Sequence, residues 1–185
     1  MKYLMIIITL FVFTFCTNAK REPRTGIAKE VSKTTAKVDA NLPPDLVNYV
    51  QSSLPNYSFL KEDQYVQGWK SFKFDGHIPF FCEADFNGDN RIDYALVLLD
   101  RLQNKLSVVA FFRKGNDFNY LIIDTYNYTE KAVDAIISTK KRGQWETIDE
   151  TIVVPYDGIN IDFVSESLSK SYYWKENKFV KVIYD

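Results

Sequence analysis

The feature that most constrains the fold of this chain is a succession of short β-type segments that begins near residue 57. Each segment is rich in valine, isoleucine, phenylalanine or tyrosine, and turn sequences such as Asp75-Gly76 and Asp157-Gly158 separate them. The predicted strands are Tyr57–Leu60, Gln67–Phe74, Ile78–Ala84, Asp93–Leu99, Lys105–Arg113, Phe118–Asp124, Thr151–Pro155, Ile159–Val164, Lys170–Lys175 and Phe179–Tyr184. Their succession predicts an antiparallel meander.

One helix is expected ahead of these strands, in the segment "NLPPDLVNYVQSSLPNY". Pro43 and Pro44 suit a helix start, where a missing N–H does no harm, and Pro55 ends the segment. The apolar stripe expected on its buried face is Leu46, Val47, Val50 and Leu54. The segment Glu130–Ser138 is a candidate for a second, short helix.

Two of the predicted strands carry apolar residues on both faces, at Val97–Leu99 and Val108–Phe112. Such strands lie in the middle of a sheet that is covered on both faces. The N-terminal helix is expected to cover one of these faces. We therefore predict an α+β domain, an antiparallel meander or curved sheet with the N-terminal helix packed on it.

The first residues predict export from the cell. Lys2 precedes the apolar run Tyr3–Phe15, which is shorter than the roughly 20 residues that cross a bilayer and matches a secretory signal. Cleavage after Ala19 would make residues 1–19 the signal peptide. Cleavage before Cys16 would instead give a lipidated cysteine, although Phe15 departs from the small residue usual at that point. The expected location is the periplasm, or the outer membrane or cell surface as a lipoprotein.

Residues 20–40 are expected to form a flexible basic tether ahead of a single domain at 41–185. The whole chain carries −1, of which +1 is Lys2 and +3 is the tether, so the domain carries about −5. An acidic domain argues against nucleic acid as a partner. Contact with a membrane is expected only through a lipid anchor on Cys16. Cys82 has no partner in the domain for a disulfide.

A metal loop is predicted in the stretch "ADFNGDNRIDYALVLL", residues 84–99, where oxygen-bearing side chains alternate. Its expected ligands are the side chains of Asp85, Asn87, Asp89 and Asp93, together with the backbone carbonyl of Arg91. Calcium takes six to eight such oxygens, and without a cation the three carboxylates would repel one another. Asn90 stands where such loops need a positive φ, which asparagine tolerates. One structural calcium ion is therefore expected; the alternative is a polar hairpin, with Asn-Gly and Asp-Asn as turn residues and no ion.

The pattern D-x-N-G-D-x-x-x-D between two strands resembles the calcium loop of the FG-GAP and VCBS repeat families. That resemblance implies the same five ligands, but a single copy excludes the propellers those families build. Leu96 stands where an EF-hand has its glutamate, so an EF-hand is also excluded. The order of "LP…LP", "DFNGD…DYALVL" and "YYWKENKFVKV" also resembles a group of exported bacterial proteins without an assigned activity.

Catalytic motifs are weak in this sequence. His77 is the only histidine and lies in an expected turn, and Cys82 is expected to be a buried, inert thiol. Carboxylate pairs such as Glu146 with Glu150, or Asp134 with Asp157, are the remaining hydrolase candidates. No catalytic residue is predicted.

The expected function is binding at the cell envelope, with an unknown protein or glycan as the partner. The alternative is a secreted hydrolase that uses a carboxylate pair or a calcium-assisted site. In "SYYWKENKFVKVIYD", Tyr172 and Trp174 share one strand face, which indicates either cross-strand packing or a surface for a partner.

Overall fold

The structure is a computed structural model that describes residues 42–72, 77–129 and 132–184. The predicted signal peptide, the lipidation site at Cys16 and the tether all lie outside these ranges. No helix among the described residues is long and apolar enough to cross a membrane.

The N-terminal helix predicted from the sequence is confirmed as α1, Pro44–Ser53, with Pro44 at its first position. Leu46 and Val50 are fully buried on its inner face. The helix ends before Pro55, and two short 3-10 helices follow, η1 at Glu62–Gln64 and η2 at Gln67–Phe72.

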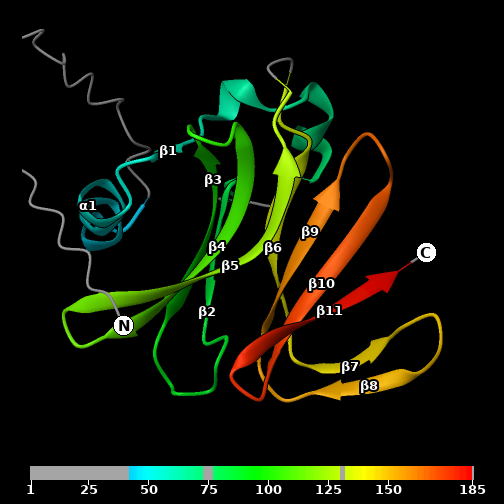
Figure 1. Cartoon of the computed structure of the whole chain (residues 1–185). Helices are drawn as coiled ribbons and strands as arrows, with labels where there is room; N and C mark the ends of the chain where they lie inside the picture. The colour runs from blue at the N-terminus through cyan, green and yellow to red at the C-terminus, as the bar shows by residue number, and fades with distance from the viewer. Residues whose placement is uncertain (1–41, 73–76, 130–131, 185) are drawn as a thin grey trace, which may run out of the picture. The chain divides into compact units, whose positions relative to one another are not determined.

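A first antiparallel sheet has the strand order β1-β3-β4-β5 (Figure 1). Its strands are β1 (Tyr57–Phe59), β2 (Phe81–Ala84), β3 (Asp93–Asp100), β4 (Lys105–Lys114) and β5 (Asp117–Asn127). Strand β2 pairs with the first half of β3, and β1 pairs with the second half along the same edge. The other edge of β3 pairs with β4 over its full length.

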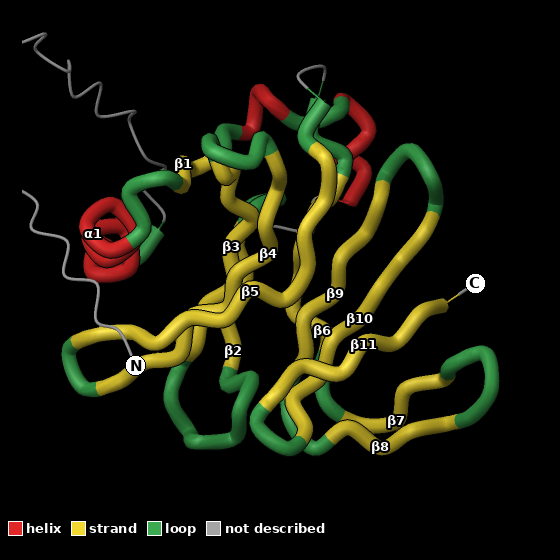
Figure 2. Tube along the Cα trace, viewed as in Figure 1, coloured by secondary structure: helices red, strands yellow, loops and turns green. Residues whose placement is uncertain are grey.

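A second antiparallel sheet has the order β11-β10-β9-β6, and a separate hairpin joins β7 to β8. These strands are β6 (Ala135–Lys140), β7 (Gly143–Glu146), β8 (Thr151–Val154), β9 (Gly158–Phe163), β10 (Leu168–Lys175) and β11 (Lys178–Tyr184). Figure 2 shows the two sheets in yellow with α1 in red beyond the first sheet. The expected single meander is therefore divided into two meanders, β3-β4-β5 and β9-β10-β11.

The core lies on both faces of β3 and β4, as the sequence predicts. On one face, Tyr49 of α1 contacts Phe111, with ring centroids 6.2 Å apart. On the other face, Phe112 contacts Trp174 of β10 at 4.9 Å. The first sheet is thus enclosed between α1 and the second sheet, and the predicted packing of the N-terminal helix on the sheet is confirmed.

Two predicted elements differ in the structure. The segment predicted as a strand from Gln67 is the 3-10 helix η2, in which Trp69 N–H bonds the carbonyl of Val66 and its ring is buried. The second predicted helix, at Glu130–Ser138, is wrong because β6 begins at Ala135 and pairs with β9. Ile136 and Ile137 are both buried, one on each face of this strand. The apolar run that also fits a helix therefore forms the strand at the end of the second sheet.

Candidate metal centre

The predicted metal loop connects β2 to β3. The last pair of the β2–β3 ladder is Ala84 with Asp93, so the intervening residues 85–92 form one long hairpin connection. Both flanks are strands, as the sequence predicts.

Asp85 holds the loop in shape through three backbone N–H groups. Its Oδ1 accepts hydrogen bonds from the N–H of Gly88 at 2.7 Å and of Asp89 at 3.1 Å. Its Oδ2 accepts from the N–H of Asn90 at 2.9 Å. Both carboxylate oxygens are therefore turned into the loop; Oδ1 already accepts two hydrogen bonds, and Oδ2 keeps one lone pair that a cation can use.

The side chains of Asn87 and Asp89 also accept hydrogen bonds from backbone N–H groups of the loop, one bond each. Asn87 Oδ1 accepts from the N–H of Asp89 at 2.9 Å, and Asp89 Oδ1 accepts from the N–H of Arg91 at 2.9 Å. Asp89 and Arg91 are exposed, which places this end of the loop at the surface. The side chain of Arg91 lies in solvent, as expected for a residue that would offer only its carbonyl.

Two residues of the loop have positive φ angles, Gly88 at 81° and Asn90 at 62°. The second confirms the backbone conformation expected at that position. At Gly88 an added Cβ would lie 2.2 Å from Cε1 of Tyr156, so that ring packs directly on the loop backbone. Tyr156 comes from the turn between β8 and β9, and the loop is therefore supported by the half of the chain that forms the second sheet.

Asp93 is the buried end of the loop, with a side chain that is 0 % exposed. Its Oδ2 accepts a hydrogen bond from the N–H of Phe86 at 3.1 Å, but its Oδ1 has no partner among the described residues. Burial raises the pKa of Asp93 to about 7, and the nearby charges of Asp89 and Asp85 add to this effect. A buried oxygen without a partner is costly, and a cation beside it would remove that cost.

The five sequence-predicted residues thus belong to one loop, and their donors are the hard oxygens that calcium prefers. Within the part of the chain that the structure describes, no three acidic, histidine or cysteine side chains converge closely enough to enclose a metal ion. The residues that fit the ion are those with an unused oxygen, above all Asp93. Amide and carbonyl oxygens from Asn87 and Arg91 would complete the set.

The structure places two of the other sequence candidates, the Cys82 thiol and the carboxylate pair Asp134 and Asp157. Cys82 is buried, and its burial raises the pKa of the thiol to about 12, so it is not a nucleophile at neutral pH. Asp134 and Asp157 flank opposite ends of the six-residue β6–β9 ladder, roughly 20 Å apart at 3.3 Å per residue. A glycosidase pair requires a separation of about 5–10 Å, so this pair is wrong.

The aromatic C-terminal segment packs inward. Tyr172 is 3 % exposed and its hydroxyl donates to Asp124 of β5, while Trp174 packs against Phe112 and Phe179. This face of β10 is therefore core, in agreement with cross-strand packing.

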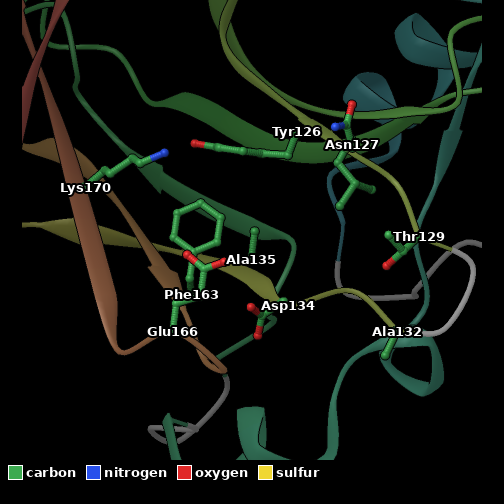
Figure 3. A pocket seen from close by; sticks show the side chains of 10 residues that line it. Tyr126, Asn127, Thr129, Ala132, Asp134, Ala135, Phe163, Glu166 and Lys170 are labelled. Atoms are coloured by element: carbon green, nitrogen blue, oxygen red, sulfur yellow. The ribbon is translucent and has the colours of Figure 1, made fainter.

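Sequence reasoning missed a pocket of about 310 Å³ between the two sheets (Figure 3). Its walls come from β4, β5, the segment before β6, and the β9–β10 hairpin. Tyr126, Phe163 and Lys170 lie on it. These residues are separated by up to 44 positions and carry no common motif, so only the pairing of the strands brings them together.

Comparisons with models of protein families, with curated protein sequences and with solved structures give no match for this chain. What the loop and the pocket can bind therefore follows from their own geometry.

Proposed function

We propose that this protein is a calcium-stabilised binding module, with one calcium ion held by the loop from Asp85 to Asp93. The observation that carries this proposal is the Oδ1 atom of Asp93, a buried carboxylate oxygen to which no group in the described residues donates a hydrogen bond. Carboxylates of this kind are usually paired or bound to a metal. The remaining ligands are Asp85, Asn87, Asp89 and the carbonyl of Arg91, as the resemblance to the FG-GAP and VCBS loops implies.

The role of the ion is structural. It would neutralise the carboxylates in the connection between β2 and β3 and so stabilise an edge of the first sheet. The pocket beside Lys170 and the pocket beside Thr139 contain no residue of this loop. We propose a stabilising ion, with a calcium-assisted hydrolase as the alternative. Export, and action at the cell envelope on a protein or glycan, remain part of the proposal because of the signal-like residues 1–19.

Thermal unfolding of the full chain tests the calcium site. At a calcium concentration tenfold above Kd, binding adds about 1.4 kcal/mol of stability. For a chain of this size, that corresponds to a rise in Tm of roughly 3–6 °C relative to excess chelator. Magnesium at the same concentration is expected to give a smaller shift, because it prefers a smaller octahedral site.

A pair of variants separates specific binding from a general effect of salt. Asp89→Asn keeps an oxygen for the N–H of Arg91 but removes a ligand charge, and it should abolish most of the calcium-dependent shift. Asp149→Asn, in the exposed turn between β7 and β8, removes the same charge far from the loop in sequence and should keep the shift. Equal shifts in both variants, or none in the natural chain, would contradict the calcium site.

A further inference from the structure

The pocket between the two sheets has one feature that the calcium loop does not explain, a mostly buried ammonium group. The side chain of Lys170 is 17 % exposed, and its Nζ lies 4.8 Å from the ring centroids of both Tyr126 and Phe163. Its nearest carboxylate is Asp124, at 4.0 Å. Within the described residues, the ammonium of Lys170 makes no hydrogen bond, although it carries three donors.

Asp124 forms an ion pair with this ammonium at 4.0 Å but accepts no hydrogen bond from it. Its Oδ2 accepts hydrogen bonds from the hydroxyl of Tyr126, at 2.6 Å, and from the hydroxyl of Tyr172. Its Oδ1 accepts from the N–H of Thr125 at 2.8 Å. The Oδ2 atom that faces Lys170 therefore already accepts two hydrogen bonds and forms only an ion pair with the ammonium, so the hydrogen-bond donors of Lys170 remain for a group in the pocket.

The pocket also contains two carboxylates, Asp134 and Glu166. Asp134 Oδ1 accepts from both the N–H and the hydroxyl of Ser165, which holds the β9–β10 turn beside the segment before β6. Glu166 is the next residue in that turn, and its carboxylate has no hydrogen bond or ion pair within the described ranges. Figure 3 shows Lys170 extending toward Tyr126, whereas Asp134 and Glu166 lie together elsewhere on the wall.

Between these charged groups the wall is mixed, with the polar side chains of Asn127 and Thr129 beside an aromatic part. Phe163 and Tyr126 pack edge to face at 5.0 Å, and Leu106 and Ala135 are buried beneath them. A volume of about 310 Å³ lies at the lower end of the range for small-molecule sites. A ligand that fits must therefore be small, partly apolar, and charged oppositely at its two ends.

We propose that this pocket binds a small zwitterion of the amino acid or dipeptide class. The ligand's carboxylate would accept hydrogen bonds from Lys170, and its ammonium would lie beside Glu166 and Asp134. Its apolar part would lie against Phe163. This site does not depend on the calcium loop, and it gives the binding module a class of ligand.

Isothermal titration calorimetry with the full chain tests the site. The probes are L-leucine and leucyl-leucine, compared with N-acetyl-L-leucine, which lacks the positive charge, and L-leucinamide, which lacks the negative one. We expect at least one zwitterion to bind and the removal of either charge to weaken its binding about tenfold or more. No binding by either zwitterion, or equal binding by the N-acetyl compound, would overturn the proposal.

Variants of the charged residues identify the pocket as the place of binding. Lys170→Met keeps the length of the side chain against the two rings but removes the charge, and should weaken binding about tenfold or more. Lys175→Met removes the same charge from an exposed position on the same strand and should leave binding unchanged. Glu166 is exposed, so Glu166→Gln should fold normally. This variant therefore tests the site even if Lys170→Met does not fold. Full binding by Glu166→Gln would contradict the proposed ammonium position.

Binding should persist in Asp89→Asn with excess chelator. That result would separate the pocket from the calcium site, so the failure of one proposal leaves the other open to its own test.

Discussion

At the scale of single residues, Asp93 makes the stability of the calcium-free protein depend on pH. Its pKa is about 7 in the folded chain, against an ordinary value of 3.8, chiefly because of its burial. Between these values the folded state binds more protons than the unfolded state, so stability falls as pH rises from about 4 to about 7. The slope is at most about 1.4 kcal/mol per pH unit.

Urea unfolding of metal-stripped protein between pH 5 and pH 7.5 measures this effect. The carboxylates of Asp45, Asp124 and Asp157 have lowered pKa values and give the opposite slope, but their effect is complete by about pH 5. Asp93→Asn cannot ionise, so its stability should be nearly independent of pH in this window. A natural chain that becomes more stable from pH 5 to 7.5 would contradict the burial of an unpaired Asp93.

Gly88 is the second residue whose substitution gives a sharp prediction. Gly88→Ala meets both a positive φ of 81° and the ring of Tyr156, and should destabilise the protein by about 1–3 kcal/mol. The matched control is Gly115→Ala, where φ is 62° and no atom lies within 4 Å of the added Cβ. Denaturant unfolding should show a clearly smaller loss in the control. Equal losses would mean that Tyr156 does not pack on the loop.

These residues also show how far the metal loop could be predicted from sequence. The alternation of Asp85, Asn87 and Asp89 is local, and so is the positive φ of Asn90, because side chains of this kind bond backbone groups a few residues away. The unpartnered oxygen of Asp93 and the contact of Tyr156 with Gly88 arise from packing across the fold. No local pattern contains them.

At the scale of elements, α1 is held mainly by its apolar face. Leu46 is 0 % exposed, so Leu46→Ala should cost about 2–5 kcal/mol. Its neighbour Asp45 forms a 2.8 Å ion pair with Arg113, but both side chains are substantially exposed, and Asp45→Ala should cost only about 1 kcal/mol or less. Chemical denaturation of the two variants measures the loss of stability in each. A larger loss from Asp45→Ala than from Leu46→Ala would mean that the ion pair, and not the apolar face, mainly holds α1.

Elements with local signals could be predicted, and those decided by tertiary contacts could not. Strands β3 and β4 are long apolar runs between clear turns, and α1 has prolines at its start and an apolar stripe. Residues 67–72 contain aromatic residues typical of strands, but they form a 3-10 helix in which Trp69 is buried. Gly68 lies against Val164, to which an added Cβ would come within 2.9 Å. Strand β7 is four residues long and was not predicted; the burial of Trp145 fixes it.

At the scale of the whole molecule, the division into two sheets follows from contacts that no sequence period records. The backbone N–H of Ile137 bonds the carbonyl of Pro79 at 2.9 Å, and the hydroxyl of Thr139 bonds the carbonyl of Glu83 at 2.9 Å. These bonds join β6 to the segment of β2, so the two sheets meet beside the metal loop. The antiparallel class could be predicted from short strands and turns, whereas this junction required the structure.

The same junction predicts that calcium stabilises the whole fold and not only its loop. The loop is attached to the first sheet through β2 and β3 and is packed by Tyr156 from the second half of the chain. If the loop unfolds only together with both sheets, calcium must shift one cooperative transition. Tryptophan fluorescence, which reports on Trp69, Trp145 and Trp174 in three different elements, should then shift with calcium by the same amount as far-UV circular dichroism. A calcium-dependent shift in only one of the two signals would mean that the loop unfolds separately, and Asp89→Asn, which should show no shift in either, is the control.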